Sequence, residues 1–326
     1  MKHGTLVISL DFELMWGMID KDSPDNYGRS NVAQVRSVVH RMVELFEKYQ
    51  VSATFATVGM QMLDGSQAVD EVMPDAKPSY VVMSLSPYNN GYYKQIKEQD
   101  QDLYFAPDLV EYLKGFSFIE IGTHTFCHYY CYEKGQTIEQ FEADLKTALA
   151  VAKNKGIKMN SIVFPRNQVS KEYLSVCAKY GIETYRGNAE IFFTKPKNSI
   201  EMWRNRLGRL VDSYVKIGGN TSYSPDSVDS DECPLNIKAS RFFRPYSRKL
   251  ALLEPLKLRR IKSEILYAAQ HNEIYHLWWH PHNFGSNMEK NLSNLEEVLK
   301  SYAKCREEYG MASMTMEEIG KLIKNG

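Results

Sequence analysis

Short apolar segments rich in β-branched and aromatic residues alternate along this chain with segments whose apolar residues recur at helical spacing. The strand-like segments lie at residues 5–11, 51–59, 116–124, 161–167, 182–186, 240–246 and 273–282. The helix-like segments lie at residues 30–49, 138–152, 170–181 and 291–324, the last with a break near Gly310. Strands that alternate with helices form βα units, so we predict an α/β fold with a parallel sheet, either a barrel or a doubly wound sheet.

Two long stretches interrupt this alternation, at about residues 60–112 and 188–236. Long connections inside compact domains are usually functional lids or mobile segments. Because α/β barrels with insertions run beyond about 250 residues as one domain, we expect the 326 residues to form a single domain, residues 1–326, with these two insertions.

The charge balance restricts the class of partner. Lys and Arg together number 40, as do Asp and Glu, so the net charge is zero. A surface that binds nucleic acid should be basic, and we therefore expect no nucleic-acid partner. No apolar run approaches the roughly 18 residues of a membrane span, and the five cysteines share no repeated spacing. We expect reduced thiols, no transmembrane segment and a cytoplasmic location.

Positive charge is concentrated in one segment. Residues 237–262 carry nine Lys or Arg and one Glu. Such a run is ordinarily the solvated face of a helix, but it also suits peripheral contact with an anionic lipid surface or with a sugar phosphate. Both interpretations stay open at this stage, as does the oligomeric state.

Polar residues gather just after the predicted strands. In a parallel βα fold, chemistry takes place at the carboxyl ends of the strands. Asp11 and Glu13 end the first strand, and their spacing of two places both carboxylates on one side of an extended chain. Three later strand-like segments also end in polar residues, namely His124 and His128, Arg166, and His280 and His282.

The pair His124 and His128 is the most specific element. If the chain turns helical after the strand, their spacing of four stacks both imidazoles on one face. Two histidines and a carboxylate, with an open position for water, form a catalytic zinc site. Burial of Asp11 and Glu13 without a cation is also costly. We therefore predict a bound divalent metal, Zn²⁺ in the first place, with Co²⁺, Ni²⁺ or Fe²⁺ as alternatives.

The other polar and aromatic residues allow two interpretations each. Arg166 is either a surface arginine or the partner that keeps a site carboxylate ionised. His280 and His282 either cap the rim of the sheet or act in the site. Trp16 and Trp279 are either core aromatics or platforms on which a sugar ring stacks.

Together these motifs resemble the polysaccharide deacetylase family, also called the NodB-homology or carbohydrate esterase family 4 type. The matching elements occur in the family's order and are SLDFE (9–13), ATF (53–55), THTFCH (123–128), FPRN (164–167) and LWWHPH (277–282). The resemblance covers about residues 5–285 and implies a distorted (β/α)7-type barrel with long loop insertions. Members of the family use a bound divalent metal to hydrolyse N-acetyl groups of amino sugars or related amides.

The resemblance also implies roles for individual residues. The implied metal ligands are Glu13, His124 and His128, and the implied catalytic residues are Asp11 as base, Arg166 as the residue that tunes Asp11, and His280 as general acid. His282 competes with His280 for the role of the acid. The candidate substrate-binding residues are Trp16, Trp279, His282 and Arg244. Glu13 stands where the family ordinarily has Asp, and no DxxDW element supplies the usual partner of the acid.

The implied activity is that of a hydrolase acting on carbon–nitrogen bonds of linear amides. It would remove an N-acetyl or N-formyl group from an amino sugar, with metal-bound water as nucleophile. The expected substrate is an intracellular precursor of a surface polysaccharide, linked to a nucleotide or a lipid. Two other classes stay open, namely a hydrolase of non-sugar amides or of glycosides on a similar barrel, and a non-catalytic carbohydrate-binding relative.

Overall fold

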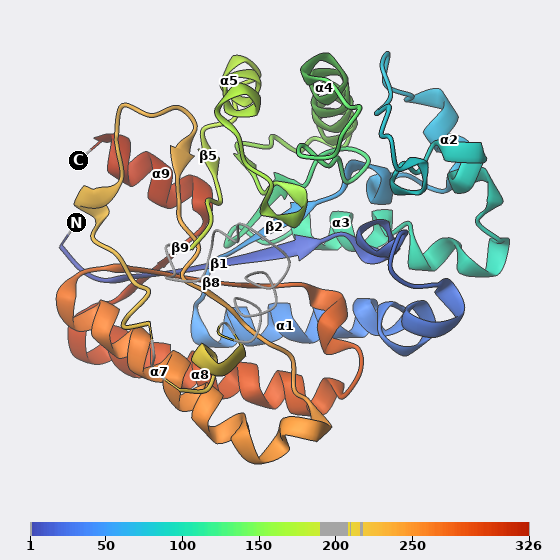
Figure 1. Ribbon diagram of the computed structural model, residues 1–326. Helices are drawn as coiled ribbons and strands as arrows, with labels where there is room; N and C mark the ends of the chain where they lie inside the picture. The colour runs from blue at the N-terminus through green and yellow to red at the C-terminus, as the bar shows by residue number, and fades with distance from the viewer. Residues whose placement is uncertain (1, 190–207, 209, 216–217, 326) are drawn as a thin grey trace.

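The computed structural model describes residues 2–189, 208, 210–215 and 218–325. Its strands are β1 (Thr5–Phe12), β2 (Ala53–Thr57), β3 (Ile119–Thr123), β4 (Ser161–Ile162), β5 (Thr184–Tyr185), β6 (Leu235–Asn236), β7 (Arg241–Phe242), β8 (Ile274–Trp279) and β9 (Ala312–Met314). Its α-helices are α1 (Val35–Tyr49), α2 (Ser66–Glu71), α3 (Pro107–Lys114), α4 (Ile138–Asn154), α5 (Lys171–Lys179), α7 (Glu254–His271), α8 (Met288–Tyr309) and α9 (Met316–Asn325). The predicted alternation of strands and helices is confirmed (Figure 1).

The strands form one parallel sheet in the order β6-β5-β4-β3-β2-β1-β8-β7. β6 and β7 belong to one extended segment, residues 235–243. Its first half bonds to β5, for example from Ile237 N–H to Tyr185 O (2.9 Å). Its second half bonds to β8, for example from Phe243 N–H to Trp278 O (2.8 Å). This segment closes the sheet, so the eight strands of the path make a seven-stranded ring, and the predicted distorted (β/α)7-type barrel is confirmed.

β1 is a fully buried strand that pairs with neighbours on both edges. Residues Thr5–Leu10 pair with β8 along one edge, while β9 and β2 share the other edge, at Thr5–Val7 and Ser9–Phe12 respectively. All eight residues of β1 are buried. The prediction of a broken helix over residues 291–324 missed β9, because three residues are too few to show a strand period. The predicted break is real, since Gly310 ends α8 with a φ of 68°.

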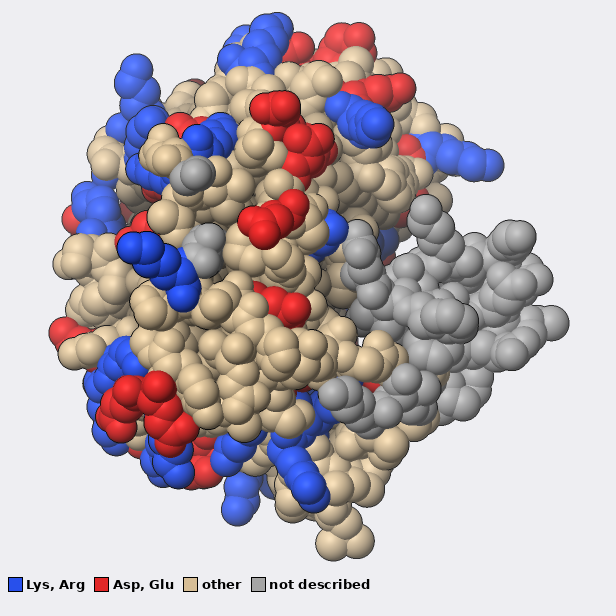
Figure 2. All heavy atoms as spheres, turned by 90° about the vertical axis from the view of Figure 1, so that its left-hand side faces the viewer, with Lys and Arg blue, Asp and Glu red and all other residues tan. Residues whose placement is uncertain are grey.

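Helices cover the ring on its outside. In Figure 1, α1, α7 and α8 lie below the strands and α4 and α5 lie above them. Both termini lie on the left, opposite the arrowhead of β1. Figure 2 shows this left-hand face, on which acidic and basic side chains are interspersed. Within the described ranges, no helix is both long enough and apolar enough to cross a bilayer.

The two predicted insertions differ in how much of them the structure describes. Residues 60–112 lie between β2 and β3 and contain α2, most of α3 and several short 3₁₀ turns, so the expected long loop is largely helical. In the second insertion, residues 188–236, positions 190–207, 209 and 216–217 lie outside the described residues.

A buried carboxyl group ties α9 to the ring. Glu120 of β3 accepts hydrogen bonds from Thr54 Oγ1 (2.7 Å) and from the backbone N–H of Glu317 (3.0 Å), in the first turn of α9. Ser161 Oγ is a further donor to this carboxyl group. These contacts satisfy an N–H that the helix itself leaves unpaired. Burial nevertheless raises the pKa of Glu120 from 4.5 to about 7.

We expect this raised pKa to make stability depend on pH. The folded protein holds a proton on Glu120 where the unfolded chain has lost it, so the contribution is full below pH 4.5 and is lost as pH rises toward 7. The free energy of unfolding should therefore fall by up to about 3 kcal/mol more over this range than in Glu120→Gln. Urea unfolding at a series of pH values measures the difference, and parallel curves for the two proteins would contradict it.

Candidate active site

Two buried carboxylates stand at the carboxyl end of β1. Asp11 is 4% exposed and Glu13 is 5% exposed, whereas Phe12 between them turns into the core against Phe55. The predicted placement of both carboxylates on one side of the strand is confirmed. Gly17 packs so closely on Glu13 that a Cβ at this position would lie 2.2 Å from its carboxylate. Any larger residue at position 17 would displace that carboxylate.

His124 and His128 approach Glu13 from the loop after β3. Nε2 of His124 lies 3.3 Å from Glu13 Oε2, and Nε2 of His128 lies 2.8 Å from the same oxygen. The chain does not turn helical after β3, because Thr125 and His128 have positive φ angles of 66° and 59°. The loop therefore brings the two imidazoles together by a route that the spacing alone did not predict.

Asp144 of α4 holds this loop in place. It is completely buried, and its carboxylate accepts the backbone N–H groups of Phe126 (2.7 Å) and Cys127 (3.0 Å). Within the loop, Thr125 Oγ1 accepts the backbone N–H of Tyr129 at 2.7 Å. A strained backbone conformation persists only where the surrounding structure holds it in place. These hydrogen bonds hold the loop in its conformation.

The residues present fit a divalent cation. One ligand atom each from Glu13, His124 and His128 lie within 4.8 Å of one another, and all three residues are buried. Nδ1 of His124 contacts Val163 O (2.7 Å), while its buried Nε2 has no hydrogen-bond partner among the described residues. Burial lowers the pKa of His128 to about 4 despite the opposing effect of Glu13, so its imidazole is neutral at pH 7, as a metal ligand must be.

Arg186 is the partner of Asp11. Its guanidinium makes two hydrogen bonds to the carboxylate, Nη1 to Oδ1 (2.6 Å) and Nη2 to Oδ2 (2.8 Å). It also donates to Ser9 Oγ and Asn167 Oδ1, each at 3.0 Å, and lies 4.1 Å from the ring centre of Trp278. Burial by itself would raise the pKa of Asp11, but the charge of Arg186 lowers it below its usual value.

The prediction that Arg166 is the partner of Asp11 is therefore wrong. Arg166 pairs with Asp20, lies 3.6 Å from Glu133 and covers the ring of Tyr130 at 4.1 Å. Both arginines follow a strand, Arg186 directly after β5 and Arg166 in the short turn Pro165–Asn167 after β4. The sequence offered the same signal for Arg186, which is the last residue of the strand-like segment IETYR (182–186).

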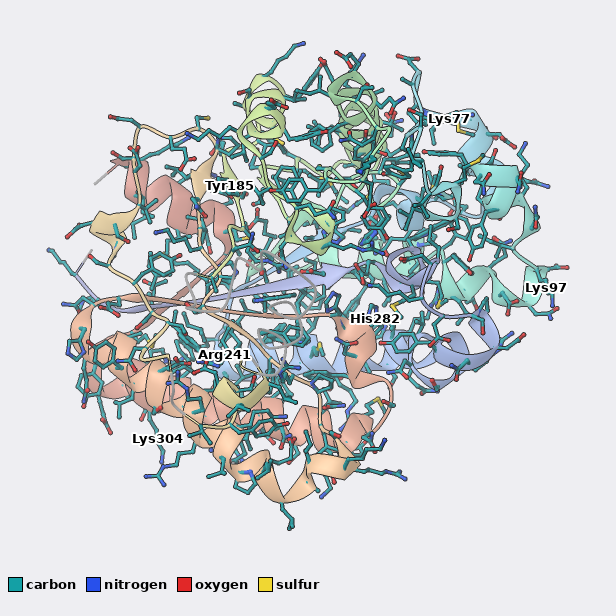
Figure 3. The ribbon with its side chains drawn as sticks, in the orientation of Figure 1. Lys77, Lys97, Tyr185, Arg241, His282 and Lys304 are labelled. Atoms are coloured by element: carbon teal, nitrogen blue, oxygen red, sulfur yellow. The ribbon has the colours of Figure 1, made fainter. Side chains whose placement is uncertain are left out.

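His280 and His282 complete the site from the end of β8. Nε2 of His280 lies 3.6 Å from both Asp11 Oδ2 and Glu13 Oε1, and its side chain is 22% exposed. Nε2 of His282 lies 3.8 Å from Glu13 Oε1, and its side chain is only 4% exposed. Burial, followed by the effect of His280, lowers the pKa of His282 to about 3. Figure 3 shows His282 just beyond the arrowhead of β1.

A polar chain that sequence reasoning missed supports His280. Asn283 Nδ2 lies 3.3 Å from His280 Nδ1, and Asn283 Oδ1 accepts a hydrogen bond from Tyr27 Oη at 2.8 Å. The chain has no DxxDW element, and the side-chain amide of Asn283 contacts Nδ1 of His280 instead of an acidic residue. In the sequence, the sign of this contact is the position of Asn283, three residues after His280.

The predicted aromatic platforms are core residues. Trp16 is completely buried and donates through Nε1 to Tyr104 O at 2.7 Å. Trp279 is also completely buried, with its ring stacked on Phe284. Neither indole can reach a sugar, so their assignment to substrate binding is wrong. Arg244 donates to Ser213 Oγ at 2.9 Å, and its role in substrate binding stays a prediction.

The family model for polysaccharide deacetylases matches residues 22–185, half of the chain. The chain belongs to the polysaccharide deacetylase family. The matched part contains His124, His128 and Arg166, whereas Asp11, Glu13 and His280 come from strands outside it. Membership makes the chain a hydrolase of amide bonds in a family that is generally metal-dependent.

Solved structures share the fold at low sequence identity. A protein from Mycobacterium smegmatis, described as a polysaccharide deacetylase, has 12% identity and a TM-score of 0.57, over 99% of this chain and 91% of that chain. A protein so described from Pseudomonas aeruginosa PAO1 has 10% identity and a TM-score of 0.55, over 97% and 89%. Puue allantoinase has 10% identity and a TM-score of 0.52, also over 97% and 89%. Comparison with curated protein sequences found no match.

We expect the purified protein to bind about one equivalent of Zn²⁺ or Co²⁺. Removal of one ligand should weaken binding, so His124→Ala and His128→Ala should each lower the affinity by roughly 100-fold or more. His271→Ala is the matched control, because this histidine is exposed at the end of α7. Isothermal titration calorimetry measures all four affinities. Failure of the wild type to bind, or unchanged affinity in both ligand variants, would contradict the assignment.

Proposed function

We propose that this protein is a metal-dependent deacetylase that removes an N-acetyl or N-formyl group from an amino sugar. The observation that carries the proposal is the pair Asp11–Arg186 set beside the ligand group of Glu13, His124 and His128. Family membership supports amide hydrolysis. The assignment of each residue to a role is part of the proposal.

Asp11 is the proposed base. When bound, the cation supplies Lewis acidity, which polarises an amide carbonyl and lowers the pKa of a water molecule. Asp11 takes the proton of that water as it attacks the carbonyl carbon. Arg186 keeps the Asp11 carboxylate ionised and oriented through two hydrogen bonds, so the base is ready without rearrangement.

His280 is the proposed acid. Its Nε2 lies 3.6 Å from each of the two carboxylates, and its partial exposure places it at the mouth of the site. A departing amine is a poor leaving group until it is protonated, and His280 donates this proton from Nε2. Asn283 contacts the other ring nitrogen and holds the imidazole in this orientation. His282 is more deeply buried, which favours His280 for this role.

The geometry supports amide hydrolysis over glycoside hydrolysis. A glycosidase needs two carboxyl groups on opposite sides of the scissile bond. Asp11 and Glu13 project from one strand toward the same imidazole of His280, and both are already engaged by Arg186 or by histidines. Neither carboxylate is left to face the other across a sugar ring.

The proposed substrate is a precursor of a surface polysaccharide, modified in the cytoplasm while linked to a nucleotide or a lipid. All five cysteines are free thiols and four of them are buried, which supports a reducing compartment. Zn²⁺ is the proposed native metal, since a site of two nitrogens and one oxygen suits it.

We expect the zinc-loaded protein to release acetate from N-acetylated amino sugars and to leave a free amine. UDP-N-acetylglucosamine, N-acetylglucosamine oligomers and a simple N-acetyl amine serve as substrates that separate the sugar and non-sugar classes. Loss of the base should lower kcat by roughly 100-fold or more in Asp11→Asn, and loss of the acid should do the same in His280→Ala. Turnover of only the non-sugar amide, or full activity in both variants, would contradict the proposal.

The two arginines should differ in effect. Arg186→Lys keeps the charge but loses the planar fork that holds Asp11, so we expect kcat to fall by roughly 10- to 100-fold with KM little changed. Arg166→Lys is the matched control and should change kcat by less than about threefold, because Arg166 does not contact Asp11. Thermal unfolding shows whether each variant is folded. A larger loss of kcat in Arg166→Lys than in Arg186→Lys would contradict this assignment and would make Arg166 the residue that tunes Asp11.

A further inference from the structure

Two clusters of apolar side chains are exposed to solvent. The first, here called tip 1, is Val81–Met83, in which Val81 is 70% exposed and Met83 is 62% exposed. The second, tip 2, consists of Leu252, Leu253 and Leu256, of which Leu252 is 94% exposed. Isolated exposed apolar residues need no explanation, but contiguous ones mark interaction sites.

Both tips lie at the end of the barrel that carries the candidate active site. Tip 1 belongs to the connection that leaves the carboxyl end of β2, before α3 returns along the barrel. Tip 2 belongs to the connection that leaves β7, before α7 returns. Hydrogen bonds confirm these positions, since Val81 N–H donates to Lys134 O (2.8 Å) in the connection after β3. Arg248 Nε donates to Asn287 Oδ1 (3.1 Å) in the connection after β8.

Positive charge flanks tip 2. Arg248 and Lys249 are exposed in the 3₁₀ turn Arg248–Leu253 that presents Leu252. The nearest acidic residue in sequence, Glu254, is buried and paired with Lys257 at 2.6 Å. Apolar residues that protrude between exposed cations are the pattern of proteins that lie on an anionic bilayer, because the apolar groups enter the interface while the cations meet the headgroups.

Much of the basic segment 237–262 cannot take part. Arg241 and Arg260 are buried against Glu264, with nitrogen–oxygen distances of 2.6 and 3.2 Å, and Lys257 is buried against Glu254. These three cations are therefore not available for the membrane contact that the sequence left open for this segment. Only its exposed part can reach a partner, and that part surrounds tip 2.

We propose that the active-site end of the barrel docks on an anionic lipid bilayer through tips 1 and 2. The lipid surface explains both observations together, the apolar residues that protrude at both tips and the cations beside tip 2. Docking in this orientation turns the candidate active site toward the membrane. The docking does not depend on the proposed function. The further step, that the substrate is a sugar carried by a membrane lipid, rests on it.

The test measures binding of the full chain to vesicles by co-sedimentation. The wild type should bind phosphatidylcholine vesicles that contain phosphatidylglycerol, should bind pure phosphatidylcholine at least about tenfold more weakly, and should lose affinity as salt rises. Leu252→Ser combined with Leu253→Ser should lower the affinity by about tenfold or more, as should Val82→Ser combined with Met83→Ser. Arg248→Glu combined with Lys249→Glu should abolish the preference for the anionic lipid.

Leu322→Ser and Lys304→Glu are the matched controls. Both residues are exposed, Leu322 on α9 and Lys304 near the carboxyl end of α8. Figure 3 shows Lys304 far from His282. Their binding should equal that of the wild type. Absence of wild-type binding to anionic vesicles, or equal binding by the tip variants, would overturn the proposal. Self-association that depends on the tips, without vesicle binding, would assign them to a second copy of the chain and would also overturn it.

Acetate release from a soluble N-acetylated sugar separates this proposal from the proposed function. The tip variants should keep the turnover of the soluble substrate, because no tip residue contacts the candidate active site. Vesicle binding without any deacetylation would leave docking supported and the proposed function wrong. Deacetylation without vesicle binding would overturn docking alone.

Discussion

Burial of two carboxylates at the end of one strand is the constraint on which the rest of this site depends. Asp11 and Glu13 are almost inaccessible to water, and an unpaired buried charge costs several kcal/mol of free energy. Arg186 compensates Asp11 through two hydrogen bonds. Imidazoles surround Glu13, with His128 nearest at 2.8 Å. The compensating groups come from the ends of three other strands, β3, β5 and β8, and the closed ring brings these ends together around the two carboxylates.

The two carboxylates are held by different means, and this suits different tasks. Asp11 is locked by a rigid guanidinium that Asn167 and Trp278 hold in turn. Glu13 faces Nε2 of His124 and Nε2 of His128, and the first of these has no hydrogen-bond partner among the described residues. Such nitrogen atoms are available to bind a cation together with the Glu13 carboxylate. The loop that carries these imidazoles has a strained backbone, and Asp144 stabilises it from outside the site. The site therefore combines a fixed carboxylate, the proposed base, with a group of side chains that fits a cation.

Sequence reasoning succeeded where a residue's position along a strand decides its direction. The period of two predicted that Asp11 and Glu13 share one side, and strand ends predicted that His124, His128 and His280 converge on them. It failed where the choice lay between equivalent positions. Arg166 follows β4 as Arg186 follows β5, and only the path of each loop decides which guanidinium reaches Asp11.

The sequence by itself determined the βα alternation, the parallel sheet and the residue types gathered at the candidate metal site, because these follow from local periodicity and from chemistry at strand ends. Tertiary structure decided what depends on packing between distant segments. It decided that residues 235–243 bridge β5 and β8 and so close the ring. It decided that Trp279 faces the core while Trp278 covers Arg186, since the face on which alternate residues point is set by neighbouring strands. It also decided that Asn283 supports His280, because a side-chain contact of this kind has no sequence period.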